Sequence, residues 1–540
     1  FQAYKSGGPQ SLTRAFLRGN ETDHTLVLIN GMKIVDSSTG RGSVDLERLK
    51  VTGVERIEVL RGSQSAIYGS EAIGGVINII LKRGTIKPVK YLNLEASNRL
   101  DKDISTGFSG NVEDLYFAVN YNHSEGPGIS AAEKSLGYHE NDSYDIDSAN
   151  LVLDYDLNTS TELSLITRVF ISENEEDDAP SGPFLDADRN SNLLDWQSAL
   201  SLNKKYELFS VNASIETARA RRYQLKNARK FRWYIADLNV GKLKFTVPVN
   251  TKEKFIFGVE TERAHMDTQD QYNAYDFKVS SSSSFYSYTN NTIKNLFLDG
   301  SFRSNHHDLF GLSTTYRVAA SYIISDSGFR LHSSFGTGYR APTLDEIYGS
   351  YGSITIKEET SRSRDIGIEY SSLNKNFVTD LTFFSTQIDN LIGYGPAPGY
   401  KFSNQGSAQN NGIEMFMKYI PNNNIIINSH YNFLTTNNNG RSLSRRKKHS
   451  GKTSINWVPE DLNMLSINSI AEYHSNARDG AFAGGHIAGY ALFHSNVNYT
   501  VDVNTKVQFK IENVLDQNYS EADTAGTYGR TLSLSLKLTF

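Results

Sequence analysis

The last ten residues of the chain alternate strictly between polar and apolar side chains. Successive side chains of a β-strand point to opposite faces, so this pattern predicts a closing strand with one apolar face and one polar face. The apolar positions are Leu532, Leu534, Leu536, Leu538 and Phe540. Such a strand either packs its apolar face on a soluble core, or turns it to lipid while the polar face lines a barrel lumen.

The composition is compatible with many strands and excludes several other classes of protein. Only 38% of the residues are hydrophobic, and no run approaches the roughly 18 to 20 apolar residues that a spanning helix needs. The 30 Tyr and 28 Phe suit the aromatic girdles of a membrane barrel, although a soluble β protein could share them. The absence of Cys excludes disulfides and thiolate metal sites, and a net charge of −5 argues against a nucleic-acid binder.

A second region, Val54 to Gly84, also has a sequence pattern typical of strands. It opens with alternating polar and apolar residues, breaks at Arg61-Gly62 and resumes as the apolar run Val76 to Leu81. This pattern predicts two strands joined by a glycine-punctuated loop.

Within this region, RIEVLRG and AIYGSEAIGGVINII resemble the plug domain of TonB-dependent outer-membrane receptors. Upstream, Phe16-Leu17-Arg18-Gly19 and the segment LVLINGMK are similar to earlier strands of the same plug, in the family's order. The resemblance implies an all-β fold, with a plug of residues 1–84 inside a transmembrane barrel of residues 85–540. At roughly 10 residues per strand, the barrel region accommodates about 22 antiparallel strands and long outer loops.

The family's energy-coupling segment, the TonB box, has no match in the first residues, so we expect the N-terminal part of the plug to be missing. No initiator Met or signal peptide is visible, which indicates a processed or truncated form.

The end of the chain shows the rhythm expected of such a barrel. Strands are predicted at Tyr490 to Val501 and Thr505 to Asn513, joined by a tight turn, and a long connection follows from Asp516 to Gly529. Short turns should be periplasmic and long loops extracellular. The terminal Phe540 resembles the signal read by barrel-assembly machinery and favours the barrel over a soluble sandwich.

One region departs from this rhythm. If Gln269 to Asn291 is a loop, the stretch before the next loop near His306 holds hardly more than one strand where a hairpin belongs. The sequence therefore suggests that a segment is missing near Asn295.

The resemblance also indicates where substrate binds. The polar stretch between Lys33 and Val44 looks like the outward-facing apex loop of the plug, unless it is simply a flexible loop. A solute can contact both plug and barrel only where this apex meets the outer barrel loops. The expected substrate-binding residues are Ser38, Thr39, Arg41, Gln64 and Ser65.

Four charged residues are candidates for an ionic lock between plug and barrel. Arg18 and Arg61 each precede a Gly, while Asp365 and Glu414 stand where the family's barrel-wall carboxylates stand. Asp365 replaces the glutamate usual there and has a shorter reach. Arginine can bridge carboxylates with bidentate geometry, so the set predicts a lock. The alternative is a group of ordinary lumen-facing charges.

The acidic stretch Glu173 to Asp195 is interpreted as an outer loop that could bind calcium. Its alternating acidic and amide residues resemble an EF-hand ladder, but Ser191 and Gln197 stand where the required Gly and Glu belong. Looser calcium binding, as the resemblance to cobalamin transporters implies, would use Asp186, Asp188 and Asp195. A solvated acidic loop without calcium is the alternative.

The remaining motifs do not predict a catalytic or cofactor-binding site. Gly336 to Ala341 fits the letters of a dinucleotide fingerprint, but Pro342 follows at once and no helix pattern succeeds it. It looks instead like the family's motif at the end of a strand, marked by Arg340, Pro342 and Glu346. The basic run Arg445 to His449 is expected at the outer rim, against lipopolysaccharide or other loops. Nothing indicates an enzyme or any cofactor beyond calcium.

The resemblance implies active import of a scarce solute across the Gram-negative outer membrane, with energy from the TonB–ExbB–ExbD system. The sequences of Gly42 to Gly75 and of Asn513 to Arg530 resemble the cobalamin transporter branch most closely, so a corrinoid is the expected substrate. A ferric siderophore or haem receptor is the alternative within the family. A passive porin or adhesin, and a soluble β-rich binding protein, are alternatives of other classes.

Overall fold

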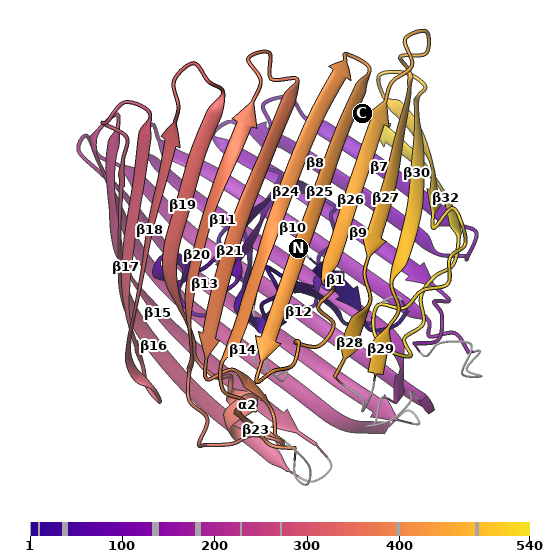
Figure 1. Cartoon of the computed structure of the whole chain (residues 1–540). Coiled ribbons are helices and arrows are strands. Elements are labelled where there is room, and N and C mark those ends of the chain that lie inside the picture. The colour runs from indigo at the N-terminus through magenta and orange to yellow at the C-terminus, as the bar shows by residue number, and fades with distance from the viewer. Residues whose placement is uncertain are drawn as a thin grey trace.

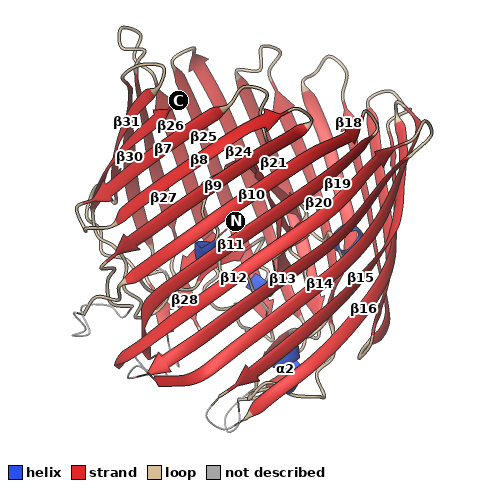
Figure 2. Ribbon diagram, turned by 180° about the vertical axis from the view of Figure 1, so that it is seen from behind, coloured by secondary structure: helices blue, strands red, loops and turns tan. Residues whose placement is uncertain are grey.

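The computed structural model describes residues 2–8, 11–34, 42–131, 140–178, 185–226, 229–270, 273–395, 400–480 and 485–540. Within these residues, 22 antiparallel strands close into a barrel, and a small N-terminal domain lies inside it (Figure 1; Figure 2). The predicted fold class is confirmed. Among the described residues, no helix has both the length and the apolarity that a membrane crossing needs.

The barrel strands follow one another around the wall almost in chain order. They are β7 (Val89–Ser97), β8 (Lys102–Val112), β9 (Leu115–Gly126), β10 (Tyr144–Asn158), β11 (Thr161–Asp178), β12 (Leu185–Lys205), β13 (Ser210–Lys226), β14 (Arg229–Asn250), β15 (Glu253–Gln269), β16 (Ala274–Asn290), β17 (Leu296–His307), β18 (Gly311–Ile323), β19 (Phe329–Arg340), β20 (Glu359–Ser371), β21 (Phe377–Asp389), β24 (Ala408–Asn422), β25 (Ile425–Asn438), β26 (His449–Trp457), β27 (Leu465–His474), β30 (Tyr490–Thr500), β31 (Thr505–Glu512) and β32 (Thr531–Thr539).

The closing strand β32 has the two faces that its alternation predicts. It pairs antiparallel with the first barrel strand β7, so the two ends of the sheet meet. Ser533 and Ser535 are only 6% and 8% exposed on the lumen side, whereas Leu534 is 58% and Phe540 70% exposed. Closure pairs the backbone groups of both terminal strands, which lipid requires.

The two ends of the barrel differ in the length of their connections. Tight turns such as 501–504 lie at the end where β32 finishes, which we call the short-turn side, at the top of Figure 1. Long connections such as 341–358 and 513–530 lie at the opposite, long-loop side, at the bottom. The predicted strands β30 and β31, their tight turn and the long connection that follows are confirmed.

The outer loops contain short elements of their own. These are α2 (Leu344–Tyr348), β22 (Ile392–Tyr394), β23 (Phe402–Asn404), β28 (Ala477–Asp479) and β29 (Gly485–Ile487). The helix α2 begins at the N-cap Thr343, whose side chain accepts from the Glu346 backbone N–H, and Glu346 caps Thr343 in return. The strand end at Arg340 and the loop start that follows therefore agree with the motif read from the sequence.

Two loops expected from the sequence are strands. The stretch Gln269 to Asn291 is mostly β16, which pairs with β15 on one side and β17 on the other, so the hairpin is complete and the prediction of a missing segment near Asn295 is wrong. The serine-rich run Ser280 to Ser284 hides this strand, because serine carries no apolar alternation and is also common in turns. In a barrel, such residues can face the lumen.

Similarly, the acidic stretch Glu173 to Asp195 is not one loop. Its two arms are the ends of β11 and β12, paired in register from Thr161↔Lys204 to Glu176↔Arg189. Glu173, Glu175 and Glu176 therefore stand on the long-loop end of a paired strand.

The plug is a four-stranded sheet with a separate hairpin. Its elements are β1 (Gln2–Lys5), β2 (Thr13–Phe16), η1 (Thr22–His24), β3 (Thr25–Ile29), β4 (Met32–Lys33), η2 (Leu46–Arg48), β5 (Val54–Arg61), α1 (Ser65–Tyr68) and β6 (Gly75–Leu81). The sheet order is β4-β3-β6-β5, with β3 and β6 parallel. The strands predicted around Arg61-Gly62 are β5 and β6, and the chain enters the barrel between Leu81 and Val89.

The strands β3 and β6 of the plug sheet are buried on both faces, whereas the edge strand β5 is largely exposed. Leu26, Leu28 and Val76 pack under α1, while Val27 and Ile77 face the barrel wall, where Ala118, Val152 and Ile166 join their cluster. A sheet buried on both faces produces near-continuous apolar strands, as in LVLI and VINIIL.

Candidate functional site

On the long-loop side, plug loops and barrel strands enclose a cavity of about 420 Å³, which we call the outer cavity. Leu12, Arg14 and Ser43 contribute from the plug, together with Asp45 and Arg48. The ends of strands β11 to β16 and the outer loops around α2 and β22 form the remaining walls. It is therefore a place where one ligand can contact plug, barrel wall and outer loops together.

The outer cavity is charge-balanced and rich in tyrosine. Its cationic residues are Arg14, Arg48, Arg222 and Arg232. Its anionic residues are Asp45, Glu176, Asp270 and Asp345. Four tyrosines complete the polar and aromatic lining, namely Tyr234, Tyr275, Tyr351 and Tyr394. Such a lining offers hydrogen bonds and aromatic surfaces without a net field that selects for one sign of charge.

Three buried polar atoms of this lining have no hydrogen-bond partner among the described residues. They are Arg14 Nε, Ser43 Oγ and Gln224 Oε1. An unsatisfied buried polar group costs about 1 to 3 kcal/mol, so a ligand that pairs with it gains correspondingly. Arg14 offers a donor and Gln224 an acceptor, a combination that complements the carbonyl oxygen and NH₂ of a primary amide.

The plug part of the outer cavity is fixed by hydrogen bonds around Asp45. This carboxylate accepts from the Thr13 backbone N–H at 2.9 Å and from the Glu47 backbone N–H at 3.1 Å, where it caps η2. Burial raises the pKa of Asp45, against the opposing effect of Arg48. On the barrel side, Arg168 donates to the Arg48 backbone oxygen at 2.5 Å and ties η2 to the wall.

Of the five substrate residues expected from the sequence, the two that the structure describes do not line this cavity. Ser38, Thr39 and Arg41 lie outside the described residues. Gln64 is 5% exposed and lines a different cavity on the other side of the plug, and Ser65 is 1% exposed beside the Tyr339 backbone. Gln64 is the N-cap of α1 and Ser65 its first residue, so neither lines the outer cavity, and their role in substrate binding stays a prediction.

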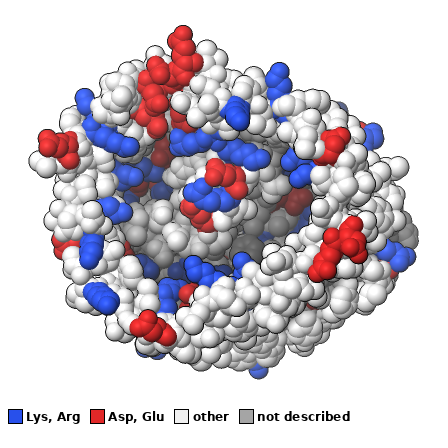
Figure 3. Space-filling view, turned by 90° about the horizontal axis from the view of Figure 1, so that it is seen from above, with Lys and Arg blue, Asp and Glu red and all other residues white. Residues whose placement is uncertain are grey.

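That other cavity, the inner cavity, has a volume of about 1570 Å³ and reaches the short turns at residues 250–254 and 289–291. Val59, Leu60 and Arg61 of β5 form its plug side, and the lumen wall forms the rest. Figure 3 looks into the barrel from this end and shows a deep hollow bordered by acidic and basic side chains. The plug therefore divides the lumen between an inner and an outer cavity.

The four residues of the predicted lock meet at the inner cavity. Arg18 lies 3.1 Å from Asp365 Oδ2 and 2.9 Å from Glu414 Oε2, and its side chain is 6% exposed. Arg61 approaches Glu414 at 3.7 Å and is 47% exposed. The Arg18 guanidinium also stacks over Phe384. Burial lowers the pKa of Arg18, but Glu414 and Asp365 outweigh that effect and raise it above its usual value. The shorter Asp365 reaches its partner, while the role of the set as a lock stays a prediction.

Of the three proposed calcium ligands, the structure describes the side chain of Asp195. Asp195 lies within β12, is buried and pairs with Arg168 at 3.1 Å, so the prediction that it belongs to a loop is wrong. The side chains of Asp186 and Asp188 lie outside the described residues. An arginine therefore already neutralises Asp195, while calcium binding by this region stays a prediction.

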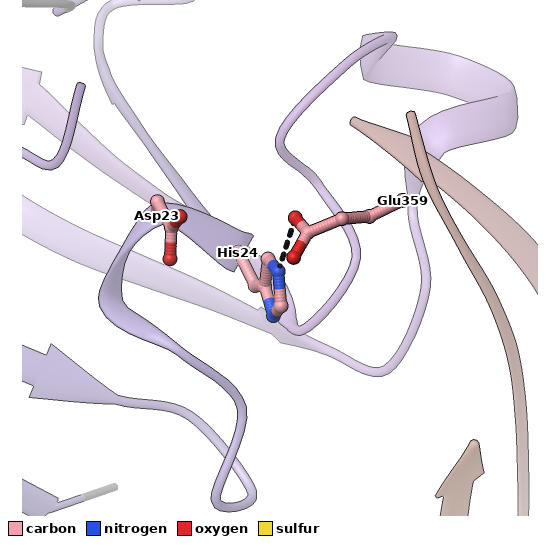
Figure 4. Close-up of side chains that lie close together, drawn as sticks. All are labelled: Asp23, His24 and Glu359. Atoms are coloured by element: carbon pink, nitrogen blue, oxygen red, sulfur yellow. Dashed lines mark hydrogen bonds and ion pairs between the residues drawn. The ribbon is translucent and has the colours of Figure 1, made fainter. Parts of the chain in front are cut away.

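A second cluster of possible metal ligands is also satisfied by arginine. Asp23, His24 and Glu359 converge in the interior, as Figure 4 shows. Arg340 contacts both carboxylates, at 3.2 Å from Asp23 and within hydrogen-bond distance of Glu359. The guanidinium thus supplies the cation of this cluster.

The basic run near residue 446 faces inward. Arg446 pairs with Glu21 of the plug at 2.9 Å and stacks over Phe16, and Lys447 donates to the Tyr490 hydroxyl at 2.6 Å. The prediction that these two residues contact lipopolysaccharide is wrong. They contact the plug and a neighbouring barrel residue instead. The apolar plug surface around Phe16 attracts the cations because its ring face is electron-rich.

Comparison with known proteins agrees with this architecture. The family model described as "TonB dependent receptor-like, beta-barrel" matches residues 91–514, and the model "TonB-dependent Receptor Plug Domain" matches residues 1–76. A relative from Photobacterium profundum, "Vitamin B12 transporter BtuB", is 24% identical across 97% of this chain and 86% of its own length.

Solved structures of low sequence identity share the fold. The siderophore receptor PirA from Acinetobacter baumannii has a TM-score of 0.84 at 15% identity and covers 100% of this chain and 93% of its own. The copper transporter OprC has a TM-score of 0.85 at 15% identity and covers 100% and 94%. With plug and barrel both matched over most of its length, the chain belongs to the family of TonB-dependent receptors of the outer membrane.

Proposed function

We propose that this protein imports a corrinoid such as cobalamin across the outer membrane, with energy supplied by the TonB–ExbB–ExbD system. The similarity to a vitamin B12 transporter supports the substrate class, and the family membership supports the energy source. The plug has to move or rearrange before the substrate can pass, since it separates the outer cavity from the inner one.

The chemistry of the outer cavity is the observation that most directly supports a corrinoid as the substrate. Ferric catecholates and haem carry net negative charge, which favours a binding surface with surplus cations. The described lining instead balances four arginines with four carboxylates. Cyanocobalamin is neutral overall and carries primary amides around a large ring, which match the donor of Arg14, the acceptor of Gln224 and the aromatic walls.

The test is a titration of purified protein with cyanocobalamin and with a panel of ferric catecholates, ferric hydroxamates and haem. We expect saturable binding of cyanocobalamin and a loss of affinity of about tenfold in Gln224→Leu, which removes one hydrogen-bond acceptor. Tight binding of a ferric chelate with no binding of cyanocobalamin would contradict the corrinoid and favour the siderophore alternative.

The class of passive porins is disfavoured by the plug contacts. A porin leaves a water-filled channel, whereas here the plug is packed against the wall and tied to it by ion pairs from Arg18 and Lys33.

A further inference from the structure

The plug residues Asp23 and His24 enter a buried group of barrel residues that we call the socket, formed by Arg340, Glu346 and Glu359. None of the three socket side chains is exposed, and Asp23 and His24 are 4% and 0% exposed. Figure 4 shows His24 directed at Glu359 from the plug. So much charge is buried here that its members must be mutually satisfied to be tolerated.

Arg340 is the centre of the socket. Its guanidinium lies 2.9 Å from Glu346 Oε2 and 3.2 Å from Asp23 Oδ2, and it donates through Nε to Glu359. Glu359 in turn lies 2.8 Å from His24 Nε2. The Glu21 backbone N–H donates to His24 Nδ1, which places the ring proton on Nε2, where it is donated to Glu359.

The same socket holds the two outer loops that line the outer cavity. Glu346 belongs to α2, and the neighbouring Asp345 and Tyr351 line the outer cavity. Glu359 accepts the Ile392 backbone N–H of β22 at 2.7 Å, and Tyr394 at the end of β22 lines the same cavity. Plug, α2 and β22 therefore share one buried charge network.

The charges of the socket show why the plug residues matter to it. Arg340 serves three carboxylates at once, and Asp23 Oδ1 has no hydrogen-bond partner among the described residues. His24 adds a donor that steadies Glu359. If the plug moves, Glu359 loses that donor and Arg340 loses one carboxylate, so the positions of α2 and β22 become less well determined.

We infer that Asp23 and His24 are positioning residues for the outer cavity, acting through Arg340 and Glu359 on the loops of α2 and β22. A seated plug keeps these loops in the geometry that binds substrate, and bound substrate stabilises the seated plug by the same free energy. An unseated plug loosens the loops on the outer side while the plug opens the way inward. This inference rests on the proposed role of the outer cavity as the substrate site.

The first experiment needs no substrate. Amide hydrogen exchange is compared in the full protein between wild type and the double variant Asp23→Asn/His24→Leu. We expect exchange in residues 343–358 and 390–395 to become at least fivefold faster. His24→Gln, which keeps a side-chain donor toward Glu359, should restore near-normal exchange when Asp23 is intact.

The matched control is Lys33→Met. Lys33 is another buried plug cation, paired at 2.6 Å with Glu262 in the middle of β15 rather than with an outer loop. Lys33→Met breaks a plug–wall contact outside the socket and leaves Asp23 and His24 in place, so exchange in the two loops should stay at the wild-type rate. Equal acceleration of the loops in Lys33→Met, or unchanged exchange in the double variant, would overturn the inference.

The second experiment changes a residue of the outer loop instead of the plug, so its result does not depend on whether the plug variant folds. Glu346→Gln weakens the socket from α2, and we expect at least threefold faster exchange of residues 22–30 of the plug and weaker cyanocobalamin binding. If wild type binds no cyanocobalamin but both exchange results hold, the substrate proposal fails and the positioning role stands. If cyanocobalamin binds and neither variant changes exchange, the positioning role is wrong.

Discussion

At the scale of single residues, Arg18 shows how one side chain can hold two domains together. It lies two residues after β2 at a left-handed backbone position (φ 53°), just before Gly19, and its side chain contacts the barrel wall. Two carboxylates from separate barrel strands, Asp365 of β20 and Glu414 of β24, receive it. The lock residues could be found from sequence because each carries a local family motif.

Neutralising Glu414 should therefore loosen the plug. Glu414→Gln removes one of two carboxylates from a nearly buried arginine, and we expect the plug contact to weaken by about 3 kcal/mol, the lower end for a broken buried pair because Asp365 remains. Sensitivity to large antibiotics and plug hydrogen exchange should both rise while the barrel assembles. The control is Glu472→Gln, whose partner Lys452 belongs to the barrel wall; permeability equal to wild type in both variants would show that there is no lock.

We expect Glu71 to make the stability of the seated plug depend on pH. Burial raises the pKa of Glu71 to about 7, with Glu262 and Asp23 adding to the shift and Lys33 and Arg340 opposing it. A raised pKa means that the seated plug favours the protonated carboxyl. Its stabilising contribution is complete below the ordinary value of 4.5 and is lost as pH rises through about 7.

We accordingly expect plug segment 66–76 to exchange faster at pH 8 than at pH 6, after correction for the intrinsic pH dependence of exchange. Glu71→Gln should remove this difference and protect the segment at pH 8. If the variant keeps the same pH dependence as wild type, another group controls it.

At the scale of elements, the sequence was informative where a strand had two chemically different faces. The strands β30, β31 and β32, and β5 and β6 in the plug, follow from alternation or from apolar runs bounded by glycine. The strand β16 and the ends of β11 and β12 did not, because serine and acidic residues on a polar lumen face resemble a loop. The outer cavity could not be predicted at all, since Arg14, Gln224 and Tyr351 come from distant elements that only barrel closure brings together.

The lipid face of β32 makes a testable prediction at this scale. Leu534 lies near the middle of the strand and is 58% exposed on the face opposite Ser533 and Ser535. Leu534→Arg should destabilise the barrel in bilayers by about 2 to 4 kcal/mol, measured by reversible denaturant unfolding. Val503→Arg in a short turn, 92% exposed, is the matched control and should change stability little. An equal, small effect of both variants would contradict a lipid-facing Leu534.

At the scale of the whole molecule, the lumen of a 22-stranded barrel is too wide for wall side chains to fill, so a second domain must occupy it. The plug does so incompletely and leaves the inner cavity of about 1570 Å³ beneath the smaller outer one. Between the two cavities lie the plug sheet and the buried charges of His24, Arg340 and Glu359. The barrier to passive flow is thus the plug and its contacts, not a narrow wall.

This arrangement predicts what happens when the plug is removed. The barrel closes through β32 and β7 without any plug strand, so a chain lacking residues 1–84 should still assemble and show heat-modifiable migration on a gel. In planar bilayers it should conduct ions steadily, because the lumen wall is polar and hydrated once the plug is gone. Wild type should show only rare, small openings, and Glu414→Gln should fall between the two because its plug stays in place but is held by fewer charges.

The deletion should also lose saturable uptake of cyanocobalamin, since the outer cavity takes Arg14 and Ser43 from the plug. If wild type conducts as strongly as the deletion variant, the plug does not seal the barrel, and the protein behaves as a passive pore.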